Sequence, residues 1–419
     1  MNESKHNTQF LGLLGQSSTF ISAFSVAQVC LTWYVFSFTG SAVAVGLVAI
    51  LETLAALLVS LPVGTLVDRL NKGMLLAVSG VAGFAVFLIL SFNVLFFSFD
   101  MAAVLMLAVV WGASREITRS AGLSALPDVV TSGTIAKSNG IYRALRSSLE
   151  SISNALAGGL IVALGVLSGF LFSAGAYLAS ALFAAFILLP FLKSKTATHP
   201  SGQEKKPSML EDLKEGFRWL VARKGFFLLT VSATFFNFFM DMIITYYVIY
   251  VAVGINATSL VYGLILSALA AGDVSGSLIG GRLNLLKYSG KINVVLFGGI
   301  PGLCILAMGI VPGIYTAILF TFIVGLCFGI SVNVWLTTAH NIVPPNMRGR
   351  YFAIDGALSS ISPVAIAAGA AVIALYGIMV DFIISGILMV LFTFVFASMR
   401  SLWKLDGRVH KERPANEAT

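Results

Sequence analysis

Three carboxylic acids occur inside long apolar runs of this sequence, where an ionisable group is costly and usually has a function. Glu52 has no basic residue within four positions, and Asp273 is surrounded by alanine and glycine. Asp241 shares a helical face with the polar residues Asn237 and Thr245. A carboxyl group in an apolar environment exchanges between a neutral and a charged form, and only the neutral form is easily accommodated there. Glu52, Asp241 and Asp273 are therefore candidates for coupling proton binding to the activity of the protein.

Other interpretations of these acids stay open. Glu52 can instead pair with an arginine from another helix, and Asp273 can act as a conformational latch. Glu150 is a fourth candidate, but Arg146 precedes it by four positions, where an intrahelical ion pair is expected. Arg115 has no local partner, so it can face an anionic substrate or pair with a carboxylate from elsewhere in the chain.

The sequence lacks the patterns of several other kinds of chemistry. Its three cysteines lie far apart in apolar runs and fit neither a disulfide framework nor a zinc site. We therefore expect no metal and no cofactor. No Gly-x-x-x-x-Gly-Lys-Ser/Thr loop occurs, which argues against an ATP-driven pump. A membrane-embedded enzyme would need catalytic residues clustered at one membrane face, and the sequence shows no such cluster.

The composition indicates that these residues lie in a membrane. The 419 residues are 58% hydrophobic and only 11% charged, and their mean hydropathy is +0.94. A soluble domain has about a quarter charged residues, so this chain cannot cover its apolar content with a water-facing shell. Each membrane span needs roughly 20 apolar residues. Hydropathy predicts an all-α integral membrane protein with helices at 10–37, 42–66, 73–97, 101–122, 138–164, 167–192, 225–251, 257–281, 291–311, 314–338, 350–376 and 379–402.

The basic residues predict how these helices are oriented. If the N-terminus is cytoplasmic, all 26 Lys and Arg residues fall on the cytoplasmic side or in the cytoplasmic part of a span. Lys and Arg in short loops set topology in this way. We therefore expect a multi-pass protein of the cell (plasma or inner) membrane with both termini cytoplasmic. Because the charges are spread between apolar segments, the net charge of +8 does not indicate binding to nucleic acid.

The predicted helices form two weakly related sets of six. Arg69-Leu70-Asn71 follows the second helix, and Arg282-Leu283-Asn284 follows the eighth, at equivalent places in the two sets. Parallel repeats of six helices place a substrate site near the membrane midplane between the halves. We predict an N-terminal bundle (1–192), a cytoplasmic linker with an amphipathic helix on the membrane surface (193–224), a C-terminal bundle (225–402) and a cytoplasmic tail (403–419).

These features resemble the major facilitator superfamily over nearly the whole chain. The segment from Gly64 to Gly73 looks like the superfamily signature between helices two and three, in which Asp68-Arg69 follows the glycine and precedes the basic residue Lys72. Helix five has Ala157-Gly158-Gly159 where many drug antiporters have a Gly-Pro signature. Further segments look like the branch of macrolide-efflux proteins and siderophore (enterobactin) exporters; they are Trp33, Thr39-Gly40-Ser41, Leu126-Pro127-Asp128, Val343-Pro344 and Arg348-Gly349-Arg350.

The resemblance implies a secondary transporter that exports hydrophobic or amphiphilic compounds by proton-driven alternating access. Its expected partners are a small-molecule substrate, protons and the lipid bilayer, and we expect a monomer. The resemblance also implies that a cytoplasmic latch breaks as the carrier changes state, formed around Gly64, Asp68, Arg69, Lys72 and Arg282. Helices one, four, seven and ten would line the substrate cavity, with candidates Ser25, Gln28, Trp33, Arg115, Asn237, Tyr246, Asn333 and Trp335.

Two alternative functions fit the same helices. One is uptake of a metabolite, or movement of a lipid such as a lysophospholipid, by a transporter of the same fold. The other is a non-transporting membrane sensor, which would be expected to have an appended soluble domain. The linker and the tail are too short for such a domain.

Overall fold

The computed structural model describes residues 2–97, 99–130, 135–192, 209–283, 285–344 and 347–408. Within these ranges the chain is helical and has no strand, and twelve helices are long and apolar enough to cross a membrane. The predicted all-α integral membrane fold is therefore confirmed.

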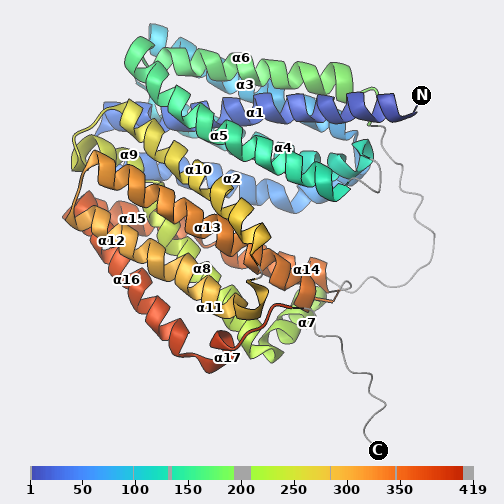
Figure 1. Ribbon diagram of the computed structural model, residues 1–419. Coiled ribbons are helices and arrows are strands. Elements are labelled where there is room, and N and C mark those ends of the chain that lie inside the picture. The colour runs from blue at the N-terminus through green and yellow to red at the C-terminus, as the bar shows by residue number, and fades with distance from the viewer. Residues whose placement is uncertain are drawn as a thin grey trace, which may run out of the picture.

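The N-terminal half consists of six long helices with short connections at the end opposite the N-terminus (Figure 1). Side chains cap several of the helices, because the first backbone N–H groups of a helix have no partner within it. Ser41 accepts from Ala44 at the start of α2, and Asp100 accepts from two amides at the start of α4. The helices are α1 (Asn2–Thr39), α2 (Ala42–Arg69), α3 (Lys72–Phe96), α4 (Met101–Val129), α5 (Ile135–Leu164) and α6 (Val166–Phe183), which a π-helical turn continues over Ala184–Leu188.

In the C-terminal half, two of the six predicted spans are interrupted. The seventh span breaks at Thr245 and Tyr246, and the eleventh breaks just before Pro363, which occupies the start of a new helix and has no N–H to continue the old one. The elements are α8 (Lys224–Ile244), α9 (Tyr247–Ile249) with a π turn (Tyr250–Gly254), α10 (Ser259–Arg282), α11 (Ser289–Asn293) with a π turn (Val294–Gly299), α12 (Ile300–Ile310), α13 (Ile314–Ile342), α14 (Arg348–Ser359), α15 (Ser362–Tyr376), α16 (Ile378–Ser398) and α17 (Arg400–Trp403).

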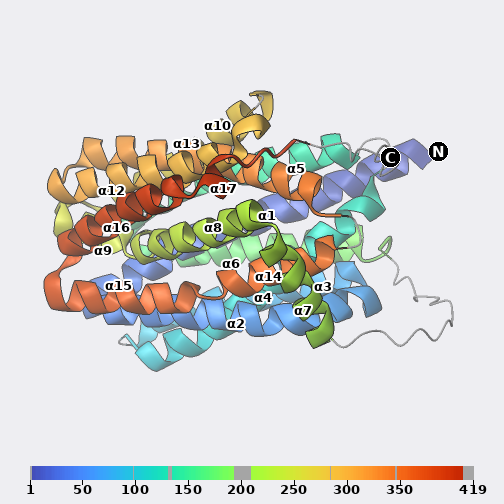
Figure 2. The same cartoon turned by 90° about the horizontal axis from the view of Figure 1, so that it is seen from below.

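The amphipathic helix α7 (Met209–Ala222) precedes the C-terminal half and packs against α14 and α8 (Figure 2). Glu215 of α7 forms an ion pair with Arg350 of α14, with 2.7 Å between Oε2 and Nη1. Leu220 is fully buried while Phe217 is half exposed, as expected for a helix with two different faces. The preceding part of the predicted linker, 193–208, lies outside the described residues, as does the tail from 409 onward.

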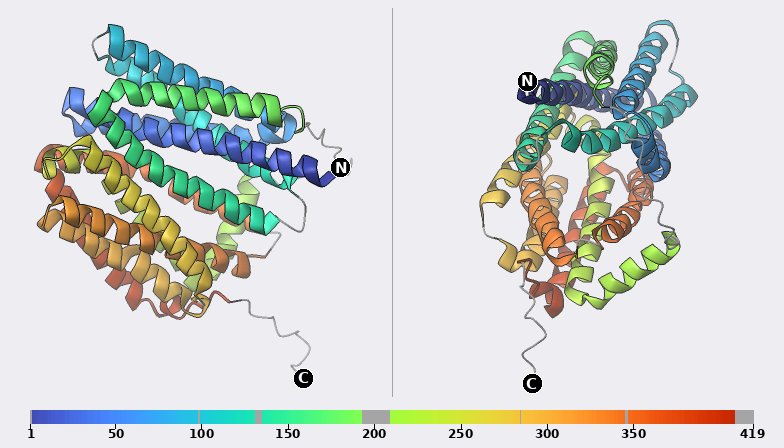
Figure 3. Two further views of the ribbon diagram at one scale, coloured as in Figure 1. Left: turned by 45° about the horizontal axis from the view of Figure 1, so that its top comes forward. Right: turned by 90° about the vertical axis from the view of Figure 1, so that its right-hand side faces the viewer.

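The two halves lie side by side and meet along two pairs of helices (Figure 3). One pair is α5 with α10 and the other is α2 with α15; we call these contacts the seam. In the α5–α10 contact, the Ser151 hydroxyl donates to the Ser267 carbonyl at 2.9 Å, and the Ser267 hydroxyl donates to the Ser151 carbonyl at 2.6 Å. A Cβ atom on Gly158 of α5 would lie 2.5 Å from the carbonyl oxygen of Ser259, so the backbones themselves are in contact there.

The predicted orientation can be tested by cysteine labelling. Thr258, just before α10, and Lys214, in α7, are both exposed. We expect Thr258→Cys to react with a membrane-impermeant maleimide on intact cells, and Lys214→Cys to react only after permeabilisation. The three native cysteines are buried, so the parent protein should give little background. Labelling of Lys214→Cys on intact cells would reverse the topology.

Candidate functional site

Two adjoining cavities, of about 260 and 340 Å³, lie between the two halves. Phe24, Gln28 and Asp241 lie in the walls of both, so we treat the two as one central cavity. Its walls come from α1, α2, α4 and α5 of the N-terminal half and from α8, α10, α13 and α15 of the C-terminal half. The polar residues of the lining are Ser25, Gln28, Thr32, Glu52, Thr53, Arg115, Ser147, Glu150, Asn154, Asn237, Asp241, Thr245, Tyr262, Asp273 and Ser362.

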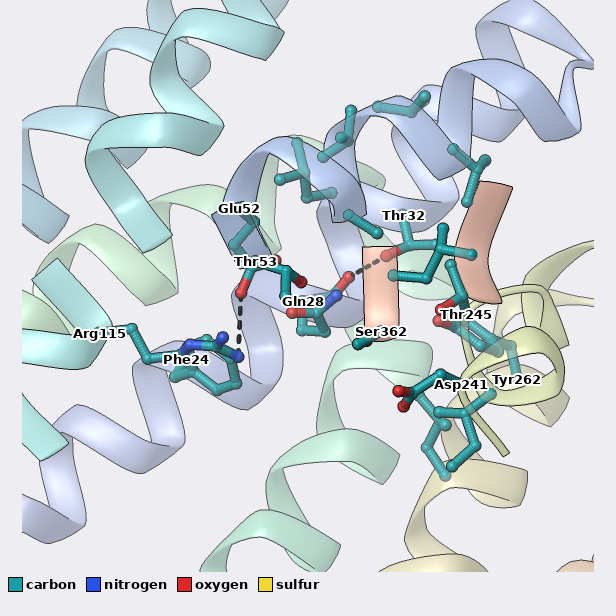
Figure 4. A pocket seen from close by; sticks show the side chains of 18 residues that line it. Phe24, Gln28, Thr32, Glu52, Thr53, Arg115, Asp241, Thr245, Tyr262 and Ser362 are labelled. Atoms are coloured by element: carbon teal, nitrogen blue, oxygen red, sulfur yellow. Dashed lines mark hydrogen bonds and ion pairs between the residues drawn. The ribbon is translucent and has the colours of Figure 1, made fainter. Parts of the chain in front are cut away.

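Glu52 and Arg115 form an ion pair across the N-terminal wall of this cavity (Figure 4). Nη1 of Arg115 lies 3.1 Å from Oε1 of Glu52, and the Glu52 side chain is only 5% exposed. The pair forms because α2 and α4 approach closely at Gly112, where a side chain would collide with the backbone of Glu52. The Arg115 guanidinium also lies 5.5 Å from the centre of the Phe24 ring. Of the alternatives open for Glu52 and Arg115, the structure shows the mutual pair.

Removing this pair should weaken the protein. Glu52→Gln leaves the Arg115 cation without its carboxylate, and breaking a buried pair typically costs about 3–5 kcal/mol. We expect a loss of about 2–3 kcal/mol here, because the Arg115 side chain is 35% exposed. The measurement is the melting temperature in detergent. Glu215→Gln is the matched control, since its carboxylate is 62% exposed and an exposed pair contributes about 1 kcal/mol or less. Equal melting temperatures for both variants would contradict this role.

Asp241 occupies the opposite wall of the cavity, on α8. In Figure 4 its carboxylate points into the open space between the halves, beside Ser362 of α15. Its place in the walls of both compartments means that a ligand in either one can reach it. The only arginine in the described lining, Arg115, is already paired with Glu52.

Glu150 and Asp273 approach each other from opposite sides of the seam. Glu150 belongs to α5 and Asp273 to α10, and both line the central cavity. Among the described residues, no ion pair within 4.0 Å joins Glu150 to Arg146, so the intrahelical pair expected from their spacing is not formed in this structure.

Four of the eight sequence-derived cavity candidates line the central cavity, and four do not. Ser25, Gln28, Arg115 and Asn237 line it. Trp33 instead stacks on Tyr262 of the other half, with ring centres 6.3 Å apart. Trp335 lines a separate chamber within the C-terminal half.

Tyr246 and Asn333 are not among the lining residues of the central cavity, and each side chain is bonded to a backbone carbonyl. The Tyr246 hydroxyl donates to the carbonyl oxygen of Ile366 at 2.6 Å. The Asn333 amide donates to the carbonyl oxygen of Ser277 at 2.7 Å, joining α13 to α10. The order of the helices and the types of their residues do not specify how each helix is rotated about its own axis. Packing against the neighbouring helices sets that rotation.

Among the predicted latch residues, the structure shows a contact for Lys72. Its ammonium group lies 2.6 Å from the Asp128 carboxylate and donates to the Ser124 carbonyl at 2.8 Å, so it links α3 to α4 within the N-terminal half. Arg282 is exposed at the end of α10. The side chains of Gly64, Asp68 and Arg69 lie outside the described residues, so the expected contact between the halves stays a prediction.

Sequence reasoning missed some polar residues of the cavity, among them Asn154 and Ser362. Single serines and asparagines are common in apolar helices, so no local signal separated them from packing residues. Asp381 was also missed: it is fully buried in α16, and its carboxylate oxygens have no hydrogen-bond partner.

Comparison with known proteins gives the family. Residues 13–361 match the Major Facilitator Superfamily, and a second match covers residues 230–418. The chain belongs to the major facilitator superfamily. This superfamily protein is 22% identical to macrolide efflux protein A of Streptococcus pyogenes over 94% of its own length and 96% of the relative's. It is 24% identical to the multidrug efflux pump Tap of Mycolicibacterium fortuitum, over 80% and 81% of the two chains.

Solved structures support the same fold for this major facilitator protein. A bacterial homologue of the human lysosomal transporter Spinster superposes with a TM-score of 0.69 at 14% identity, over 97% of this chain and 99% of that one. A bacterial homologue of the iron transporter ferroportin gives 0.63 at 14% identity, over 95% and 100%. The superfamily match and the twelve membrane-length helices of the described residues together identify a multi-pass secondary transporter of the plasma membrane.

Proposed function

We propose that this major facilitator protein exports amphiphilic small molecules in exchange for protons. The observation that supports the proposal most is the position of three carboxyl groups, on Asp241, Glu150 and Asp273, in one cavity between the two halves. Coupling requires that proton binding and substrate binding influence each other, and carboxyls in the cavity wall allow this.

The lining suits a ligand that is partly apolar and partly charged. Phe24, Leu266 and Phe328 provide apolar surface among the polar groups, as in most small-molecule sites. The described lining holds four carboxyl groups, on Glu52, Glu150, Asp241 and Asp273, and one basic group, on Arg115. We therefore expect preferred substrates to be amphiphiles that carry a positive charge.

The pair across the seam provides a route from protonation to alternating access. The carboxyl groups of Glu150, on α5, and Asp273, on α10, line the central cavity from the two halves, so protonation of either one changes the charge beside the α5–α10 contact. A cationic substrate that binds between the carboxylates competes with protons for the same groups. Protons and substrate then occupy the cavity alternately, which is exchange.

The two efflux relatives support the direction and the kind of substrate in this proposal. Macrolide efflux protein A aligns over nearly the whole of both chains. The multidrug efflux pump Tap aligns over about four fifths of each.

Reconstitution into liposomes tests the proposal. Purified protein is exposed to an imposed pH gradient and a panel of amphiphilic amines, with uncharged analogues of similar size for comparison. We expect the amines to accumulate against their concentration gradient and a protonophore to abolish this accumulation. If no compound of the panel moves uphill, the proposal fails.

A further inference from the structure

The short helices α11 and α17 and the residues next to them form one surface of the C-terminal half. Hydrogen bonds join the two segments: the Gly407 amide donates to the Leu286 carbonyl at 2.8 Å, and the Ser289 hydroxyl donates to the Leu405 carbonyl at 3.1 Å. Figure 1 shows α17 at the edge of the C-terminal half that faces away from the N-terminal half. This surface therefore lies apart from the central cavity and the seam.

The surface carries an excess of positive charge. Residues 285–293 and 399–408 contain five basic side chains and one acid, Asp406. The Asp406 carboxylate is paired with the fifth basic residue, Arg408, at 2.6 Å. No ion pair within 4.0 Å joins the other four to a carboxylate of the described residues. We call these four the basic corner; they are Lys287, Lys291, Arg400 and Lys404.

Aromatic rings hold two of these ammonium groups near each other. Nζ of Lys287 lies 5.4 Å from the centre of the Tyr288 ring, and Nζ of Lys291 lies 5.5 Å from the same centre. Nζ of Lys291 also lies 5.2 Å from the centre of the Trp403 ring, and ring faces attract ammonium groups. Because two cations beside one ring repel each other, an anion that contacts both is favoured there.

The surroundings distinguish a lipid headgroup from a soluble anion. Tyr288 is 46% exposed, and Tyr and Trp are enriched where membrane spans meet the headgroups. The span that continues from Lys291 through α12 has exposed apolar side chains at Val295 and Leu303, which suit acyl chains. The basic corner also lies on the side predicted to be cytoplasmic, where anionic lipids attract Lys and Arg.

We propose that the basic corner binds an anionic phospholipid, with the phosphate between Lys287 and Lys291 and the acyl chains along the exposed face of α12. The inference does not rest on proton-coupled export, because lipid binding is measured at equilibrium and requires no transport.

Trp403 provides a signal at the site itself. The full-length protein in detergent micelles is titrated with phosphatidylglycerol that carries brominated acyl chains, which quench nearby tryptophans. Trp403→Phe gives the contribution of the other tryptophans, so the difference reports Trp403 alone. We expect saturable quenching by phosphatidylglycerol, and binding at least about tenfold weaker for brominated phosphatidylcholine, whose headgroup has no net charge.

Two double variants test the lysines. Lys287→Gln/Lys291→Gln should weaken binding of phosphatidylglycerol by at least about tenfold, and Lys287→Arg/Lys291→Arg, which keeps both charges, should bind like the parent protein. The matched control Lys214→Gln/Arg282→Gln removes the same charge from exposed positions on α7 and α10 and should leave binding unchanged. Melting temperatures in lipid-free detergent show whether the variants are folded, and the comparison of the two lipids on the parent protein needs no variant.

Several results would overturn the inference. They are equal binding of the two lipids, unchanged binding in Lys287→Gln/Lys291→Gln, and an equal loss in the control, which would mean that only the total charge matters. Inorganic phosphate at millimolar concentration should not displace the lipid. Displacement would assign the basic corner to a soluble phosphate compound, and the lipid site would then be wrong while the proposed exchange stands.

Discussion

Replacement of Asp241 by asparagine is expected to abolish uphill export. With a pH gradient of one unit, exchange of one proton per substrate supports up to about tenfold accumulation, and the variant should reach a ratio near one. The Asp241 carboxyl lies in the wall of both compartments of the central cavity. The asparagine amide has nearly the same shape, but it does not ionise and therefore cannot bind and release a proton during the cycle. The measurement is the accumulation ratio of a transported amine in proteoliposomes.

The same variant should still move substrate down its gradient, because the asparagine preserves the shape of the cavity. This separates a loss of coupling from a loss of folding or of binding. Glu215→Gln, which removes an exposed carboxylate, is the control and should accumulate substrate like the parent protein. Accumulation at the parent level in Asp241→Asn would assign the coupling to other groups, with the Glu150–Asp273 pair the first to test.

Gly263→Ala should shift the protein away from the conformation described above. A Cβ atom on Gly263 of α10 would overlap the carbonyl oxygen of Asn154 and lie 3.0 Å from the backbone nitrogen of Gly158, both on α5 across the seam. Overpacking of this kind costs about 1–3 kcal/mol, which shifts an equilibrium between conformations by about 5- to 150-fold. Spin labels at the exposed ends of α5 and α15, on Leu164 and Tyr376, should then report a population with a longer distance.

A second glycine of the same helix provides the control. A Cβ atom on Gly276 would collide with Leu326 of α13, which belongs to the same half. Gly276→Ala should therefore lower the melting temperature and leave the distribution of distances between the labels unchanged. Equal distance distributions for Gly263→Ala and the parent would mean that the seam does not separate during the transport cycle.

The span positions were predictable because membrane thickness fixes the length of each apolar run. The third helix, expected over 73–97, is found at Lys72–Phe96. The interruptions near Tyr246 and Ile361 were not predicted, since the residues on either side are as apolar as the rest of the span. A hydropathy window averages over such breaks, and only Pro363 gave a local signal.

The candidate site was predictable in residue type but not in pairing. Rarity of charge in apolar runs singled out Glu52, Asp241 and Asp273, and all three line the central cavity. The partner of Glu52 depends on how α4 is placed against α2, which the contact at Gly112 sets. Tyr246 lies on an expected cavity helix, yet its hydroxyl is bound to the backbone of α15. The partner that each of these side chains binds depends on contacts between segments far apart in the sequence.

The most direct test of proton-coupled exchange records proton and substrate movement together. Proteoliposomes with an internal pH indicator receive a pulse of a transported amine with no pH gradient imposed. For proton-coupled exchange we expect that protons leave the lumen as the amine enters, that the two rates change together, and that Asp241→Asn abolishes the proton signal alone. Entry of the amine without any proton movement, or with protons moving in the same direction, would contradict it.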